Sequence, residues 1–319
     1  CNCFGKDVKM KLSKLCKVGM SFLTKPYYRT RVLIKLGYYD SLSDEEFLKK
    51  VFPKYMGYPL DLENPKTFSE KLQWLKVNYR EPIQTVMVDK YEAKNFIAQR
   101  VGEQYIIRTL AVWDSVEDID FDALPNQFVL KCTHDSGGIV ICKDKSSLDR
   151  EAAKAKLSAS LQRDYSRISR EWPYKDVPRR IIAEEYLSEL GSNEILDYKM
   201  YCFHGKPKLT VVCSNRFSKT GTRMNFYDID WNPMGIHFGH YPPVSTEFTR
   251  PETYEEMLRL ATELSKACPF LRVDFYEIKG RLYIGELTFF PGAGLEKFRP
   301  MTKDYELGEW LHLETVHRG

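Results

Sequence analysis

The sequence lacks any apolar run close to the roughly 20 residues that a bilayer-spanning helix needs. The short run "VGMSFL" is too brief for the core of a signal peptide, and no cleavage-site pattern follows it. Internal repeats and low-complexity tracts are also missing. With 319 residues, 43% of them hydrophobic, the chain has the composition of a globular protein with one large or two modest domains.

The sequence also lacks cysteines or histidines at metal-binding spacing. The pair Cys1 and Cys3 has no second pair that would complete a zinc site. His237 and His240 lie in a Gly/Pro-rich loop without further ligands, and we interpret them as incidental. Free cysteine in an apolar run behaves as a small hydrophobe, and this usage indicates a reducing, cytoplasmic compartment. Four of the eight cysteines lie in such strand-like runs: Cys132, Cys142, Cys202 and Cys213.

Charge is nearly balanced over the chain, with a net charge of +4, but it is uneven. Residues 1–35 carry nine Lys or Arg against Asp7 alone, a local net charge of +8. Within them, residues 10–23 mix apolar side chains with lysines, as in a basic amphipathic helix on an anionic membrane surface. The alternative is a helix packed on the domain with a solvated basic side. We treat residues 1–40 as a basic N-terminal segment for which both interpretations stay open.

Local signals predict the order of the elements. Capping boxes at Ser43 with Glu46 and at Thr67 with Glu70 predict helix starts within an N-terminal helical region over residues 41–88. A further helix over 89–102 ends at Gly102. The mixture of helices, strands and hairpins indicates the α+β class with largely antiparallel sheets. The other predicted elements are strands at 127–132, 139–142 and 179–187, hairpins at 197–213 and 271–287, and helices at 147–165, 251–268 and 304–314.

Two acidic residues occupy the last hairpin. A turn at Lys279-Gly280 places Asp274 and Glu286 opposite each other on paired strands. Two opposed carboxylates repel each other unless a cation lies between them, and Mg²⁺ takes such oxygen ligands. Thr288 points to the same face as Glu286 and adds a hydroxyl. The alternative is an outward-facing acid pair on a solvated sheet.

A glycine-rich loop follows the strand in "FVLKCTHDSGG". Lys131 ends this strand, and the glycines after it let backbone N–H groups approach phosphate oxygens. The order of lysine and glycine is not that of a Walker A loop, and the Rossmann pattern is absent. The alternative is a hairpin turn with an incidental lysine.

The order of these pieces resembles the ATP-grasp superfamily. It runs "VDKYEAKNFI", "FVLKCTHDSGG", "IIAEEYL", "DYKMYCF", "LRVDFY" and "GELTFFPGAG". The phrases "NPKTFSEKLQWLK", "REWPYKDV" and "NFYDIDWNP" are similar to the TupA-like (teichuronopeptide-biosynthesis) branch, found among bacterial surface-polysaccharide genes. The likeness covers about residues 42–312. It implies two α+β subdomains that clasp ATP between antiparallel sheets, one over residues 89–187 and one over 188–319.

The resemblance also implies nucleotide-binding roles. Lys131 and Lys90 would hold the phosphates, with Lys94 as the alternative to Lys90. Glu184 would contact the adenine amino group, and Asp197 would take the ribose hydroxyls. The other residues implied in nucleotide binding are the loop residues His134, Ser136, Gly137 and Gly138, the hinge residues Glu185, Tyr186 and Leu187, and Lys199, which would reach the phosphates.

At the reacting end, the resemblance makes Asp274 and Glu286 magnesium ligands, with Thr288 where the superfamily usually carries Asn. Arg272, in an Arg-x-Asp triplet, would stabilise the oxyanion of an acyl transfer. The alternative role of Arg272 is a salt bridge that neutralises the acids. Lys131 would also be a catalytic residue, through its contact with the phosphates. The loop residues Pro291, Gly292 and Gly294 would hold a carboxylate or an acyl phosphate through N–H groups.

The implied function is a carboxylate–amine ligase that uses ATP and Mg²⁺. ATP would phosphorylate a carboxylate, and an amine would attack the acyl phosphate to form an amide. The branch implies an acidic sugar or peptide of a bacterial surface polysaccharide as the substrate, and no nucleic acid as a partner. Residues 150–180, with nine basic side chains against four acids, suit an anionic substrate or form a solvated helix face. The alternatives are a kinase, a glycosyltransferase and a non-catalytic nucleotide-sensing scaffold.

Overall fold

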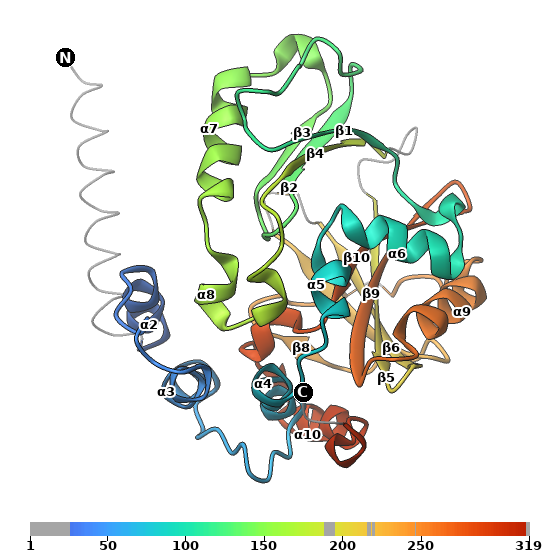
Figure 1. Ribbon diagram of the computed structural model, residues 1–319. Helices are drawn as coiled ribbons and strands as arrows, with labels where there is room; N and C mark the ends of the chain where they lie inside the picture. The colour runs from blue at the N-terminus through green and yellow to red at the C-terminus, as the bar shows by residue number, and fades with distance from the viewer. Residues whose placement is uncertain (1–25, 188–194, 216–217, 219–220, 246, 317–319) are drawn as a thin grey trace, which may run out of the picture. The chain divides into compact units, whose positions relative to one another are not determined.

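The computed structural model describes residues 26–187, 195–215, 218, 221–245 and 247–316. The chain divides into two compact units, residues 1–64 and 65–319, and Figure 1 colours it by residue number. The basic helix predicted over residues 10–23 lies outside the described residues. Among the residues that are described, no helix combines the length and the apolar character needed to cross a membrane.

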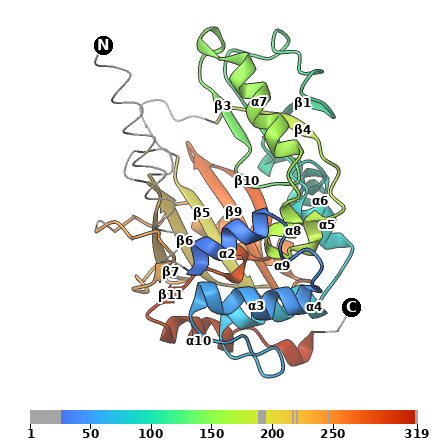
Figure 2. The same cartoon turned by 90° about the vertical axis from the view of Figure 1, so that its left-hand side faces the viewer.

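The first unit contains two helices that pack on each other, α2 (Pro26–Lys35) and α3 (Asp44–Met56) (Figure 2). The predicted capping box at the start of α3 is confirmed. The Ser43 hydroxyl accepts the N–H of Glu46 at 3.3 Å, and the Glu46 carboxylate accepts the N–H of Ser43 at 2.9 Å. Gly57, with φ of 85°, ends the helix in the left-handed conformation that glycine adopts without strain.

The second unit contains two larger antiparallel sheets, of four and five strands, and a two-stranded one formed by β8 and β11 (Figure 1). The smaller sheet has the order β1-β4-β2-β3, and α7 (Arg150–Leu161) packs against β2 and β3. Ala153 and Leu157 of this helix share one apolar core with Phe128 and Leu130. The three predicted strands of this sheet, β2, β3 and β4, are confirmed, with ends that differ by at most two residues. The strands are β1 (Thr109–Trp113), β2 (Phe128–Cys132), β3 (Ile139–Cys142) and β4 (Ile181–Glu185).

The larger sheet has the order β10-β9-β5-β6-β7, and α9 (Tyr254–Ser265) packs against β5, β6 and β9. Both predicted hairpins are confirmed. Their turns, at His204-Gly205 and Lys279-Gly280, have positive φ at both central residues, as a two-residue hairpin turn with the matching twist requires. The strands are β5 (Asp197–Phe203), β6 (Lys206–Ser214), β7 (Arg223–Asp228), β9 (Phe270–Ile278) and β10 (Arg281–Thr288).

Helix α4 (Phe68–Asn78) begins at the second predicted capping box, in which the Thr67 hydroxyl accepts the N–H of Glu70 at 3.1 Å. The ring of Phe68 contacts Phe203 and Phe270 of the larger sheet, with ring centroids 5.4 and 4.9 Å away. On other sides α4 packs against α10 (Thr302–Glu309) and the 3₁₀ turn η4 (Pro291–Gly294). The helix therefore supports the loop that follows β10.

Helices α5 (Ile83–Val88) and α6 (Glu92–Val101) flank the sequence Asp89-Lys90-Tyr91. The helix predicted over 89–102 begins later, at Glu92, because the Asp89 carboxylate accepts the N–H groups of Tyr91 and Glu92 at 2.8 and 3.3 Å. Helix α5 packs against β10, and Figure 1 shows α5 and α6 beside this strand. This arrangement brings Lys90 next to the acidic hairpin.

The predicted α+β class is confirmed, and the four cysteines predicted in strands are buried as free thiols. The helix predicted over 304–314 is shorter, because α10 ends at Glu309. The Lys71 ammonium donates hydrogen bonds to the carbonyls of Gly308 and Leu311 at this end, both at 2.8 Å. The remaining elements are α8 (Tyr165–Ser169), β8 (His237–Phe238), β11 (Phe298–Arg299), η1 (Glu103–Tyr105), η2 (Lys145–Ser147), η3 (Trp172–Tyr174) and η5 (Leu313–Thr315).

Candidate active site

Asp274 and Glu286 lie directly opposite each other on β9 and β10, as the sequence predicts. Regular pairing from the turn would place Asp274 opposite Gly285 instead, because Phe275 pairs with Ile284. A bulge at Gly285 shifts the register by one residue and brings Glu286 into line. A side chain at position 285 would clash with the ring of Tyr276, 2.5 Å from the Cβ position, so the bulge requires glycine.

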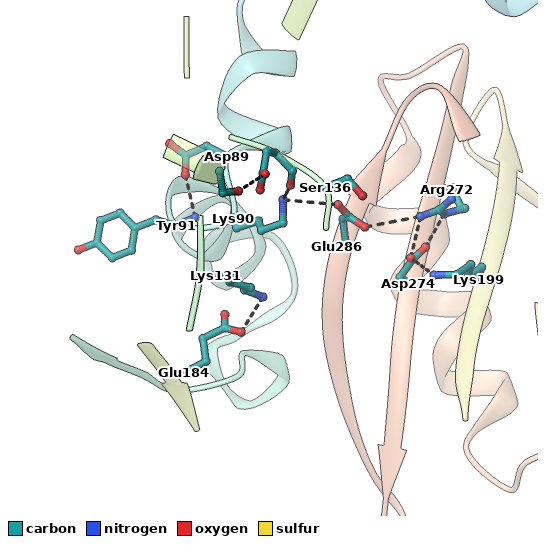
Figure 3. Close-up of polar contacts among 12 residues, drawn as sticks. Asp89, Lys90, Tyr91, Lys131, Ser136, Glu184, Lys199, Arg272, Asp274 and Glu286 are labelled. Carbon is teal, nitrogen blue, oxygen red and sulfur yellow. Dashed lines mark hydrogen bonds and ion pairs between the residues drawn. The ribbon is translucent and has the colours of Figure 1, made fainter. Parts of the chain in front are cut away.

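Cationic side chains surround the acid pair (Figure 3). The guanidinium of Arg272 donates to both oxygens of Asp274, at 2.6 and 2.8 Å, and the ammonium of Lys199 also bonds Asp274. Glu286 has weaker contacts, 3.6 Å to Arg272 and 3.8 Å to Lys90, and its side chain is 32% exposed. The more exposed carboxylate of the pair is therefore the one with room for a further ligand.

The fold favours the ionised forms of the side chains in this cluster. Burial alone would raise the pKa of Asp274, but Arg272 and Lys199 outweigh it and hold the pKa below its usual value. Burial likewise opposes the charge of Lys199 and Arg272, yet the neighbouring carboxylates raise the pKa of both groups. Lys199 pairs additionally with Asp197, at 2.7 Å. Asp274 is therefore an ionised acid at neutral pH.

Thr288 follows Glu286 by two residues on β10 and is buried. Its hydroxyl oxygen has no hydrogen-bond partner among the described residues. In the described part of the chain, no group of three or more His, Cys, Asp or Glu forms a metal cage. Two carboxylates and a hydroxyl still fit Mg²⁺, because this ion is commonly held by one or two carboxylates together with phosphate oxygens and water.

A second charged cluster lies where the smaller sheet meets α6. The carboxylate of Glu184, on β4, forms ion pairs with two ammonium groups. Lys131 of β2 contacts one oxygen at 2.6 Å, and Lys94 of α6 contacts the other at 2.7 Å. Burial would raise the pKa of Glu184, but the two ammonium groups hold it below its usual value. Lys94 also bonds the carbonyl of Ile107 at 2.7 Å and the hydroxyl of Thr109 at 2.6 Å. Among the described residues, the ammonium of Lys94 has three partners, whereas that of Lys131 has one, Glu184.

Lys90 lies between the glycine-rich loop and the acid pair. Its ammonium donates to the carbonyl of Asp135 in the glycine-rich loop and faces Glu286 (Figure 3). A pocket between α6, β4 and β10 is lined by the charged residues Lys90, Lys94, Glu184 and Glu286 together with apolar side chains. The structure therefore brings together lysines and acids that are almost 200 positions apart in the sequence.

The glycine-rich loop has a buried base and an exposed tip. His134 is buried, and its Nε2 lies 3.2 Å from the carbonyl of Arg163, so this imidazole does not face the pocket that Lys90 lines. Ser136 and Gly137 are exposed. Gly137 has φ of 100°, a backbone conformation that favours glycine, and a Cβ on Gly138 would lie 1.9 Å from the Ser160 hydroxyl oxygen, so the neighbouring side chain leaves no room for one.

The predicted hinge and ribose residues lie at two different places. Glu185 is exposed at the end of β4, and its N–H already donates to the carbonyl of Arg108 at 3.0 Å. Tyr186 and Leu187 follow it and are half-buried. Asp197, at the start of β5 in the larger sheet, is completely buried beside Lys199.

The loop after β10 is stabilised by hydrogen bonds from two side chains of α4 that no sequence motif indicates. Gly292, Ala293 and Gly294 have consecutive positive φ values, and the N–H of Ala293 is used within the loop. The buried ammonium of Lys76 bonds the carbonyl of Ala293 at 2.7 Å, and Gln73 bonds that of Gly294 at 2.8 Å. Both side chains lie in "NPKTFSEKLQWLK", but their buried role has no signature in the sequence.

Another unpredicted group near the acids comes from residues 165–174. The buried carboxylate of Glu171 accepts the Ser169 hydroxyl at 2.6 Å. Burial raises its pKa, and Glu286 adds to this effect, while Lys76 opposes it. Glu171 lies in the segment "REWPYKDV". This segment contributes to the family resemblance, but it does not predict an acid at the site.

Comparison with protein families assigns the chain to the ATP-grasp class. The matching family is described as TupA-like ATP-grasp, and the match covers residues 70–312. The chain therefore belongs to the TupA-like ATP-grasp family, which confirms the resemblance. Together with the two larger antiparallel sheets, this membership also confirms the expected ATP-grasp fold.

Several solved structures resemble the chain at low identity. The D-alanine–D-alanine ligase of Bacillus anthracis in complex with ATP has 15% identity over 72% of this chain and 64% of that chain, with a TM-score of 0.41. The corresponding ligase of Helicobacter pylori has 12% identity over 78% and 68%, with a TM-score of 0.42. An L-amino acid ligase of Bacillus licheniformis has 15% identity over 83% and 56%, with a TM-score of 0.37. The chain thus spans less than two thirds of the length of the first of these. A comparison with curated proteins found no match.

Proposed function

We propose that this protein is an ATP- and Mg²⁺-dependent carboxylate–amine ligase that acts through an acyl phosphate. The observation that carries the proposal is the line of charges from Lys90 through Glu286 to Arg272 and Asp274. It places a lysine that bonds the glycine-rich loop beside two opposed acids and an arginine. Family membership supports the use of ATP. We assign residues 89–187 and 188–319 to the two lobes that clasp the nucleotide.

In this scheme Lys131 and Lys90 bind the nucleotide phosphates, and the glycine-rich loop covers them with its exposed tip, Ser136 and Gly137, and with the buried Gly138 that follows. His134 supports the loop from its buried base. Lys199 lies at the edge of the acid pair, where it would neutralise phosphate charge. Adenine would lie against the end of β4, at Glu185, Tyr186 and Leu187. Glu184 keeps its two lysine partners and still has lone pairs for the adenine amino group, and Asp197 would take the ribose.

Asp274, Glu286 and Thr288 would hold Mg²⁺. When bound, the ion neutralises charge on the transferring phosphate. The pairing of β9 with β10 places the two carboxylates opposite each other, and Arg272 and Lys199 keep Asp274 ionised. Because the buried hydroxyl of Thr288 has no hydrogen-bond partner in the described part of the chain, a ligand at this position would also satisfy an otherwise unfavourable polar group.

Arg272 would act on the carboxylate substrate. The carboxylate oxygen attacks the terminal phosphorus of ATP, and ADP leaves, which gives an acyl phosphate. The amine nitrogen then attacks the acyl carbon, loses a proton, and expels phosphate to form the amide. The Arg272 guanidinium would stabilise the oxyanion that forms during this attack. The loop at Pro291, Gly292 and Gly294, supported by Lys76 and Gln73, would hold the acyl group.

The substrate would be a uronic acid or an acidic peptide of a bacterial surface polysaccharide. The TupA-like family and the excess of basic side chains over residues 150–180 support this class. A glycosyltransferase is less well supported. In the Asp-x-Asp pair at 228–230, the carboxylate of Asp228 accepts the N–H groups of Asp230 and Asn232, at 3.0 and 2.8 Å, and so serves a turn.

The test is incubation of the protein with ATP, Mg²⁺, hydroxylamine and single carboxylates such as D-glucuronate or L-glutamate. Hydroxylamine converts an acyl phosphate into a hydroxamate with release of phosphate. We expect hydroxamate and ADP in equal amounts with an accepted carboxylate. A stable phosphorylated sugar without hydroxamate would support a kinase, and binding of ATP without any cleavage would support the nucleotide-sensing scaffold.

Lys131→Met is expected to weaken binding of Mg·ADP about tenfold, because hydrogen bonds to charged groups contribute about 1.5–3 kcal/mol. Lys94→Met is the matched control, since it also deprives Glu184 of an ammonium partner. The control should lower the melting temperature, because three bonds are lost, and change the affinity less than twofold. Titration calorimetry measures both variants. Equal losses of affinity would show that Glu184, and not a phosphate contact, is responsible.

We further propose that the basic N-terminal segment contacts anionic membranes at the inner face of the cell membrane. Substituting Lys9, Lys11, Lys14 and Lys17 by Gln should reduce co-sedimentation with phosphatidylserine vesicles by at least tenfold, since each lysine near such a surface contributes about 1 kcal/mol. Binding to neutral phosphatidylcholine vesicles is the control. Equal co-sedimentation of the wild type and the variant with phosphatidylserine vesicles would contradict membrane binding by this segment.

A further inference from the structure

Arg180, just before β4, holds the sequence around Lys90. Its Nη2 donates to the carboxylate of Asp89 at 2.8 Å and to that of Glu92 at 2.9 Å, and its guanidinium lies over the ring of Tyr91 at 4.8 Å. Asp89 is buried, and its other oxygen accepts the N–H groups of Tyr91 and Glu92. The three residues that flank Lys90 are therefore tied to one guanidinium.

The same arginine is joined to the start of the glycine-rich loop. The N–H of Thr133 donates to the carbonyl of Arg180 at 2.9 Å, and the Thr133 hydroxyl accepts the N–H of Arg180 at 3.2 Å. The carbonyl of Thr133 in turn accepts the N–H of Lys90 at 3.2 Å. Thr133 directly precedes the loop whose Asp135 carbonyl receives the Lys90 ammonium. Lys90 is thus fixed to the loop at its backbone and at the end of its side chain.

Stability alone does not account for this arrangement. The Nε atom of Arg180 is buried and has no hydrogen-bond partner among the described residues. An unsatisfied buried donor lowers the stability of a protein. The guanidinium nevertheless bonds the segment around residue 89, while the backbone of the same residue bonds Thr133, so Arg180 joins the two segments from which Lys90 and the glycine-rich loop approach each other.

We propose that Arg180 is a positioning residue for nucleotide binding, which acts through Asp89 and Thr133 to hold Lys90 and the glycine-rich loop in one arrangement. This inference rests on the phosphate-binding role that the proposed function gives to Lys90. No bond to the nucleotide is assigned to Arg180. Neither the motifs nor the family resemblance marks this residue, because its partners are 47 to 91 positions away.

The test is a double-mutant cycle with Arg180→Met and Lys90→Met, measured by calorimetric titration with Mg·ADP. Lys90→Met is expected to weaken binding about tenfold, as for the loss of a charged hydrogen bond. Arg180→Met alone should weaken binding about fivefold. If Arg180 acts through Lys90, the double variant should bind within twofold of Lys90→Met, because the two effects are not independent. Multiplication of the two single losses would overturn the proposal.

Two further variants keep the test decisive. Arg180→Lys retains the charge but loses the forked donor, and it should weaken binding two- to threefold; it replaces Arg180→Met in the cycle if that variant does not fold. Arg250→Met breaks an exposed arginine–carboxylate pair with Glu255 and should leave the affinity unchanged. Absence of Mg·ADP binding by the wild type would reject the proposed function itself. Wild-type affinity in both Arg180 variants, with Lys90→Met impaired, would reject only the positioning role.

Discussion

Glu286→Gln is expected to lower turnover by at least about 10³-fold, because an interaction of several kcal/mol with the metal and the transferring phosphate is lost, and each 1.4 kcal/mol corresponds to about tenfold in rate. The amide preserves the shape of the side chain and removes only its charge. ADP release in the presence of Mg²⁺ and an accepted carboxylate measures the effect. Turnover at the wild-type rate would contradict the metal assignment.

The control for this substitution is stability. Glu286 is one-third exposed and contacts cations only at 3.6 Å or more, so the melting temperature of Glu286→Gln should stay close to that of the wild type. Asp274→Asn is the contrasting variant. It leaves the buried cations of Arg272 and Lys199 without their shared anion, and it should lower the melting temperature as well as turnover.

Arg272→Lys separates a ligase from a kinase. The lysine keeps the positive charge but loses the planar, forked donor. In a ligase, amide formation should fall about 10²-fold, the size expected for loss of an oxyanion donor, while acyl-phosphate formation should fall much less. The measurement is the ratio of amide, formed with an accepted amine, to ADP released. The wild type should couple the two products in equal amounts, and the variant should release ADP in excess.

Hydroxylamine provides the internal control for Arg272→Lys. Hydroxamate yield reports the acyl phosphate that the variant still makes, so a variant that simply misfolds would lose hydroxamate and amide together. A melting curve close to that of the wild type is required, because Arg272 also pairs with Asp274. Parallel loss of both products in a folded variant would assign Arg272 to the phosphoryl transfer step instead.

Features with a local cause could be predicted from the sequence. The capping boxes at Ser43 and Thr67 and the turn at Lys279-Gly280 depend on residues within four positions of one another, so their energetics are contained in short segments. The turn sets the regular pairing as far as Phe275 and Ile284, and the predicted opposition of Asp274 and Glu286 is confirmed. The sequence does not predict the bulge at Gly285 that completes this opposition, because the need for glycine there comes from the ring of Tyr276 across the ladder.

The class of fold, the family resemblance and the short motifs that carry the candidate lysines and acids can all be predicted from the sequence alone. Which of these charges contact one another depends on the packing of distant segments. Lys94 and Lys131 share Glu184, and Arg180 bonds both Asp89 and Thr133, and the bonded residues are 47 to 91 positions apart in the sequence. Such pairs have no sequence signature, because a buried charge needs a partner but any segment that packs beside it can supply one.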